Sequence, residues 1–302
     1  MVPLFFLVAP KSSAQSNWRV WQNCQQRLNG NWILIDADRV MPAGPFKGRK
    51  LSPTSPSPAL QVLKDSETLI LPTEVPKESW AVSNLWTQTG PAVAIVPRVA
   101  PSEVTLLRER EVDGTFHLLL RLQYSKEHPI RFWPQNWQGL AGSPQEVWDV
   151  VIDFGTQRVL GEERTPFNVW RGLTGQFALQ ARMGTSSSRI RRIRFERREV
   201  VEFPMSLTEE QRFSIIRHFI VRSRLIGRGE MYNSIVKNCA TEFSLLFDVV
   251  GEGLCHQKSP LSRSIYRSVS WIPSGLLWAL RRQGWEISDQ AREIELAEEN
   301  RK

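Results

Sequence analysis

The chain has 302 residues, of which 41% are hydrophobic and 23% are charged, so it is long enough to bury a sizeable core and its composition excludes an intrinsically disordered protein. The net charge of +8 favours contact with anionic surfaces and carries no information about the fold. Twelve Trp residues offer flat apolar faces that suit sugar or lipid contacts as well as a core.

The chain begins with MVPLFFLVAPKSSAQ, in which the apolar run Val2–Ala9 is too short to cross a bilayer, since a spanning helix needs roughly 20 residues. This stretch fits the end of a secretory signal, with Ser12 to Ala14 as a small-residue cleavage site; the alternative is a short apolar strand. We therefore interpret residues 1–14 as a leader and expect a periplasmic or secreted protein.

Three cysteines are present, and an odd number in an oxidising compartment leaves one thiol free or paired with another chain. One arrangement is a disulfide between Cys24 and Cys255 with Cys239 free. Because the chain has no CxxC spacing, we expect no metal site, and no motif indicates a cofactor.

Residues 15–103 are rich in Trp and Pro, and we expect them to form an embellishment of the main domain. Pro42–Pro58 should be an extended surface segment. The main domain is expected at residues 104–273, followed by a helical tail at residues 274–302, in which PSGLLWALRRQGW predicts an amphipathic helix.

The main domain is predicted to begin with two strands joined at Asp113-Gly114, a dipeptide that strongly indicates a hairpin turn. In the second strand, TFHLLLRLQY, His117 lies on the face opposite the row of alternating leucines. VWDVVIDFG predicts another strand, which we expect to end at Gly155.

The stretch RIRRIRFERREVVEF, from Arg189 to Phe203, alternates and predicts a long strand with one wet face. Its arginines form either a solvated face or a binding surface for phosphate or carboxylate, because guanidinium pairs with both through two hydrogen bonds. The anion-binding candidates are Arg192, Arg194 and Arg198.

A helix should begin after Thr208, whose pairing with Gln211 is typical of a capping box. A second helix should begin at Cys239 with Asn238 as its N-cap and end at Gly251. The start of a helix carries free N–H groups and a partial positive charge, which favour a thiolate and can hold an oxyanion. Cys239 is thus either a nucleophile or a small buried residue.

A cysteine nucleophile needs a base, and the base needs an orienting group. His218 lies in the middle of a predicted helix, and His128 and His256 lie in predicted loops, so His117 is the candidate base. Asp149 and Asp153 on the next strand are candidates for the orienting carboxylate, and Asp153 is preferred because it lies near the strand end.

The succession of TFHLLLRL, VIDFG, RREVVEFPMSLTEEQRFSIIRHF and YNSIVKNCATEF resembles the Lnb N-terminal periplasmic domain family over roughly Thr105 to Pro273. The element NCATEF also resembles circularly permuted papain-like folds such as the lecithin:retinol acyltransferase group, in which histidine precedes cysteine. The resemblance implies an α+β, permuted papain-like fold with an antiparallel sheet packed against the cysteine-bearing helix. It matches Cys239 to the motif cysteine and His117 to the strand histidine, with Asn238 and Tyr232 as substrate or oxyanion contacts.

These observations lead to an exported thiol hydrolase that cleaves an amide or ester bond in a cell-envelope glycopeptide or lipid, with Cys239, His117 and Asp153 as its catalytic residues. One alternative is a lipid acyltransferase of the same fold. Another is a non-catalytic module that binds the envelope through its Trp and Arg surfaces. The net charge also fits an anionic membrane surface, whereas export excludes nucleic acid as a partner.

Overall fold

The computed structural model describes residues 39–52, 59–63, 71, 73–110, 116–135, 143–163, 167–196, 198–226, 229–251, 273–282, 284–288 and 292–293. The expected leader, Cys24, Cys255, His256 and the Asp113-Gly114 turn lie outside these residues.

Twelve strands form one sheet in the order β11-β10-β4-β5-β8-β9-β2-β3-β6-β7, with β1 beside β2 and β12 beside β10. Its described pairings are antiparallel except that of β2 with β9. The strands are β1 (Gln61–Val62), β2 (Ser79–Thr87), β3 (Gly90–Pro97), β4 (Glu103–Arg110), β5 (Phe116–Gln123), β6 (Ile130–Pro134), β7 (Gln145–Val147), β8 (Asp149–Gln157), β9 (Ala178–Thr185), β10 (Val200–Ser206), β11 (Glu286–Ile287) and β12 (Arg292–Glu293). The fold is therefore a mixed α+β fold with a large open sheet.

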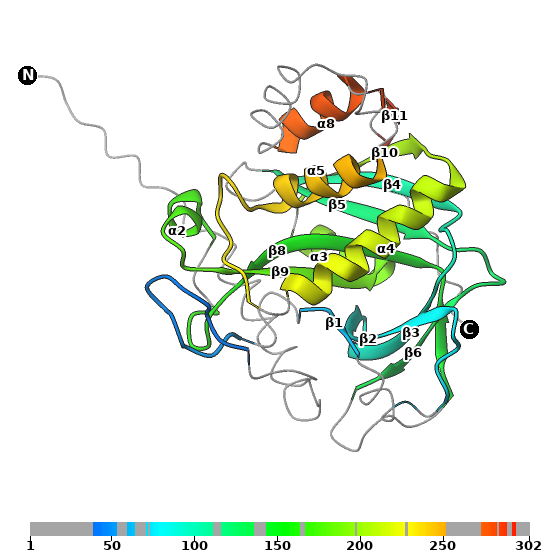
Figure 1. Cartoon of the computed structure of the whole chain (residues 1–302), viewed down its shortest axis with the longest axis horizontal. Coiled ribbons are helices and arrows are strands. Elements are labelled where there is room, and N and C mark those ends of the chain that lie inside the picture. Colours follow the sequence, from blue (N-terminus) through cyan, green and yellow to red (C-terminus); the bar gives the residue numbers. More distant parts are fainter. Residues whose placement is uncertain are drawn as a thin grey trace, which may run out of the picture.

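Two helices cross one face of the sheet, as Figure 1 shows for α4 (Glu209–Ile226) and α5 (Cys239–Val250). Their apolar residues share a core with the even-numbered leucines of β5 and with α8 (Pro273–Arg282). The ring of Phe154 in β8 packs against Phe219 of α4 and Phe243 of α5, with centroids 5.4 and 5.2 Å apart. These contacts fix the cysteine-bearing helix on the sheet.

The opposite face of the sheet is covered by α3 (Ser186–Phe195), whose Ile190 and Ile193 pack on Leu107, Leu119 and Val151. A small helix, α2 (Val169–Leu173), precedes β9. The alternation predicted for β5 is confirmed, because Leu118 and Leu120 join the core under α4 and α5, whereas Leu119 joins the core under α3.

The prediction of one long strand from Arg189 to Phe203 is wrong for its first half, which is helix α3, and correct from Val200 onward, which is β10. The isoleucines three residues apart fit a helix as well as the alternating pattern fits a strand, and arginine favours a helix. The predicted end of a strand at Gly155 is also wrong, because β8 continues to Gln157.

The predicted caps of α4 and α5 are confirmed. Thr208 and Gln211 form the capping box of α4, each accepting a hydrogen bond from the other's backbone N–H. Asn238 is the N-cap of α5, and Gly251 is its C-cap.

Strands β2 and β3, together with β11 and β12 near the C-terminus, belong to the same sheet as the strands between them.

Candidate active site

The loop that leads into α5 is held by its own hydrogen bonds. Asn233 and Lys237 exchange two backbone bonds of 3.0 Å, which close a tight hairpin. Asn238 then caps the helix: its Oδ1 accepts from Thr241 N–H at 3.0 Å, and its Nδ2 donates to the Ser234 carbonyl at 2.8 Å. The chain therefore enters the helix at a fixed point, with Cys239 as the first helical residue.

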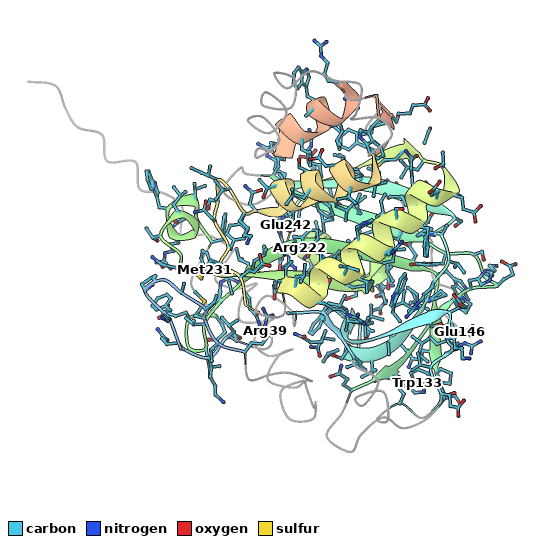
Figure 2. The ribbon with its side chains drawn as sticks, viewed as in Figure 1. Arg39, Trp133, Glu146, Arg222, Met231 and Glu242 are labelled. Carbon is cyan, nitrogen blue, oxygen red and sulfur yellow. The ribbon has the colours of Figure 1, made fainter. Side chains whose placement is uncertain are left out.

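A partly buried ion-pair network joins the first turn of α5 to its neighbours. Arg222 of α4 donates two hydrogen bonds to Glu242, of 2.7 and 2.9 Å, and two to Glu230, of 2.6 and 2.7 Å. Lys237 also pairs with Glu230. Figure 2 shows Arg222 and Glu242 between α4 and α5. Because Glu242 follows Cys239 by three residues, the network holds the helix start in place.

His117 lies near the start of β5, beyond the last pairing of that strand with β8. The register of the two strands runs from Gln123 opposite Asp149 to Leu119 opposite Asp153. Helix α5 packs on both strands, and the charge of Cys239 raises the pKa of the His117 imidazole, so the two side chains lie near each other. The thiol is 6% exposed and belongs to a free cysteine.

The carboxylate of Asp153 contacts the imidazole, with its Oδ2 3.3 Å from His117 Nε2. Two arginines hold this carboxylate: Arg182 of β9 donates to Oδ1 at 2.5 Å and to Oδ2 at 2.8 Å, and Arg189 of α3 donates to Oδ2 at 3.1 Å. Arg189 also reaches Glu109 at 3.3 Å. Asp153 is 3% exposed, so its charge is compensated by protein groups and not by water.

The electrostatics of the site favour an ionised histidine and an ionised aspartate. Burial lowers the pKa of His117, but the charge of Cys239 and the hydrogen bonds to Asp153 and Cys239 outweigh it and raise the pKa from 6.5 to about 10. Burial raises the pKa of Asp153, yet the charges of Arg182 and Arg189 and the bond to His117 hold that pKa well below its ordinary value.

Cys239, His117 and Asp153 thus lie together, with Asn238 beside them as the helix cap. Asp149, the other candidate carboxylate, binds Arg121 instead, with oxygen–nitrogen distances of 2.5 to 3.0 Å.

Tyr232 and the remaining described histidines lie in other settings. The ring of Tyr232 is buried and packs edge-on against Phe167, with centroids 5.8 Å apart. His218 Nδ1 contacts the Ser214 carbonyl of its own helix at 2.8 Å, and His128 is exposed in a turn.

The arginines of the predicted anion site contact carboxylates of this chain. Arg192 binds Glu196 at 3.0 Å, and Arg198 pairs with Glu109 and Glu196. Arg194 lies in α3. Arg192 and Arg198 therefore belong to a network of ion pairs with Glu109 and Glu196. They do not lie on the solvated strand face that the sequence pattern predicted.

Sequence reasoning missed Arg182, Arg189, Glu109 and the Arg222–Glu242 pair. Arg182 had one signal in the sequence, because it is the single charged residue in the strand ALQARMGT. A lone cation in a buried strand indicates a buried anion. The identity of that anion, Asp153, depends on the pairing of β8 with β9.

The fold and this cluster define a mixed α+β protein with a cysteine near a histidine that contacts an aspartate. The model of the Lnb N-terminal periplasmic domain matches residues 117–270, about half of the chain, and this chain belongs to that family. The matched region runs from His117 through Asp153 to α5, and the protein is accordingly periplasmic or extracellular. No curated protein and no solved structure matches the chain. Among the described residues, no helix is both long and apolar enough to cross a membrane.

Proposed function

We propose that this protein is a cysteine-dependent acyl-transfer enzyme of the cell envelope, a thiol hydrolase in which Cys239 is the nucleophile, His117 the base and Asp153 the group that orients the imidazole. The observation that carries the proposal is one imidazole that lies 3.3 Å from the Asp153 carboxylate and near enough to Cys239 for the charge of that residue to raise its pKa. The order of the site, a histidine on a strand followed by a cysteine at a helix start, supports a circularly permuted papain-like arrangement.

In the first half of the reaction, the Cys239 thiolate attacks the carbonyl carbon of an amide or ester and forms a C–S bond. Thr241 N–H is taken by the Asn238 side chain and Glu242 N–H by the Asn238 carbonyl, so the N–H groups of Cys239 and Ala240 are the candidate donors to the oxyanion. The C–N or C–O bond then breaks, and the imidazolium gives its proton to the leaving nitrogen or oxygen.

In the second half, His117 removes a proton from water, whose oxygen attacks the thioester. The acyl group leaves as a carboxylic acid, and the proton returns to the Cys239–His117 pair. Asp153 keeps the imidazole oriented in both halves without itself becoming protonated, because two arginines stabilise its charge.

Transfer to an amine or alcohol in place of water is the second candidate function, because exposed apolar side chains surround the cysteine loop. Val236 is 73% exposed and Trp170 of α2 is 76% exposed. The two segments are linked by a 2.9 Å hydrogen bond from Ser234 Oγ to the Val169 carbonyl, and Figure 1 shows α2 and this loop at one end of the molecule. Such a surface suits the acyl chain of a lipid substrate.

The experiment is labelling with a chloroacetamide probe, followed by incubation with muropeptides and with phospholipid vesicles. We expect the wild type to be labelled at Cys239, and Cys239→Ser and His117→Ala to lose this labelling. A thioester on Cys239, seen by intact mass, identifies the substrate class: an acyl mass from phospholipid supports the transferase, and a peptide-derived acyl mass supports the hydrolase. Absence of labelling in the folded wild type would contradict both and favour a binding module.

A further inference from the structure

We propose that Arg182 is a positioning residue of this site, which clamps the Asp153 carboxylate and holds a permanent cation against Nε2 of His117. The inference rests on the proposed function of His117, and it adds a residue that motif comparison does not supply.

The guanidinium of Arg182 contacts both partners at once. Its Nε and Nη2 bind the two oxygens of Asp153 at 2.5 and 2.8 Å, and the same Nη2 lies 3.2 Å from His117 Nε2. Arg182 and Asp153 are register partners on neighbouring strands, so their side chains share one face of the sheet. The Arg182 side chain is 11% exposed, which limits screening of its charge by solvent.

Gly155 provides the space that Arg182 occupies. A Cβ atom built on Gly155 would lie 2.4 Å from Arg182 Nη2 and 2.7 Å from its Cζ. Gly155 follows Asp153 by two residues, so the missing side chain is on the same face of the strand. Even the smallest side chain at this position would therefore push the guanidinium away from its present contacts.

Charged groups approach the imidazole from each strand and helix around it. The charged or titratable residues in this cluster are Glu109 of β4, Asp153 of β8, Arg182 of β9, Arg189 of α3 and Cys239 of α5. Among the described residues of this cluster, Arg182 is the cation that lies within hydrogen-bond distance of an imidazole nitrogen.

This placement opposes retention of the proton on His117. The imidazole must accept a proton from the thiol or water and give one to the leaving group, so its proton has to be released in every turnover. Asp153 favours the imidazolium, whereas the guanidinium neutralises part of the carboxylate charge and repels the cation directly. Loss of Arg182 would leave Asp153 bound to Arg189, and the pKa of His117 would rise.

The test is an NMR titration of His117 in the full chain with Cys239→Ser as background, which removes the thiolate from the measurement. We expect Arg182→Gln to raise the titration midpoint of His117 by at least about half a pH unit, since a charge within about 4 Å of a partly buried group is worth more than that. Arg182→Lys retains the cation, so its His117 midpoint should lie closer to that of the Cys239→Ser background than the midpoint of Arg182→Gln does.

Gly155→Ala provides a second route to the same change without altering any charge, and it is expected to raise the midpoint too. Arg131→Gln, at an arginine on β6 with a side-chain exposure of 55%, is the matched control for loss of one charge and should leave the midpoint unchanged. An unchanged or lower midpoint in folded Arg182→Gln, or in Gly155→Ala if the Gln variant does not fold, would overturn the inference. Labelling of Cys239 in the otherwise wild-type chain tests the proposed function separately.

Discussion

Arg222 and Glu242 bind each other through two hydrogen bonds, of 2.7 and 2.9 Å, and thereby tie the first turn of the cysteine-bearing helix to the helix beside it. The Glu242 side chain is 1% exposed, so its charge depends on this arginine. Cys239, the proposed nucleophile, is consequently positioned by an ion pair one turn away as well as by the cap of its own helix.

Glu242→Gln should lower the free energy of unfolding by about 2–3 kcal/mol, because it removes one partner from a buried pair while Arg222 keeps Glu230. Urea denaturation followed by circular dichroism measures the change. Glu78→Gln, at an exposed position, is the control and should stay within about 0.5 kcal/mol of wild type. Equal stability of Glu242→Gln and wild type would show that the pair does not hold the helix.

Asn238→Ala should lower the free energy of unfolding by about 1 kcal/mol, because the Thr241 N–H loses its acceptor at the helix start. Asn238→Ser retains a side-chain oxygen that can cap the helix and should lose much less stability. The same denaturation experiment compares the two variants. If the alanine and serine variants are equally stable, the cap contributes no measurable stability.

Cys239 should be the cysteine that iodoacetamide alkylates fastest at neutral pH, because the proposed mechanism pairs its sulfur with the imidazole of His117. Peptide mapping by mass spectrometry after short labelling times gives the rate at each cysteine. His117→Ala should slow alkylation of Cys239 by roughly tenfold or more while the circular dichroism spectrum stays the same. An equal alkylation rate of Cys239 in His117→Ala and in wild type would show that His117 does not activate the thiol.

His117 should titrate at a lower pH once the thiolate is removed, because the charge of Cys239 is the first of the influences that raise its pKa to about 10 against the opposing effect of burial. Cys239→Ser is therefore expected to move the NMR midpoint of His117 down by more than about one unit. His117→Gln assigns the resonance. A midpoint that does not move would mean that the two side chains are not electrostatically coupled.

Glu230 should contribute to acid sensitivity. The hydrogen bonds from Arg222 come first among the causes that lower its pKa from 4.5 to about 2, although partial burial acts in the opposite direction. A carboxylate with a depressed folded-state pKa stabilises the fold above the unfolded value, and this contribution disappears as the pH falls. Stability should thus decrease between about pH 4.5 and 2, and the decrease should be smaller in Glu230→Gln. Parallel curves for the two proteins would exclude this carboxylate as a source of acid sensitivity.

The sequence predicted those parts of the site that depend on neighbouring residues in the chain. Asn238 before Cys239 and a helical apolar stripe mark the start of α5, and the alternation in β5 places His117 opposite its leucines. The prediction for the arginine-rich stretch failed because Ile193 and Phe195 fit strand alternation in a short window, whereas the three-residue spacing of Ile190 and Ile193 fits one face of a helix. Arg182 could not be assigned a role because its partners come from β5 and β8, and only the sheet register brings those strands together with β9.

The parallel contact between β2 and β9, with Trp86 opposite Gly184, has a consequence for the order in which the chain folds. It joins residues about 100 positions apart, and contacts between distant segments form slowly because their loop-closure entropy must be overcome first. The strands that carry His117, Asp153 and Arg182 are adjacent on one side of this seam, in the order β5-β8-β9. The neighbourhood of the cysteine can therefore become ordered before the β2-β3-β6 part is joined to β9, and hydrogen exchange during refolding should protect the β5–β8 pairing before the β2–β9 contact.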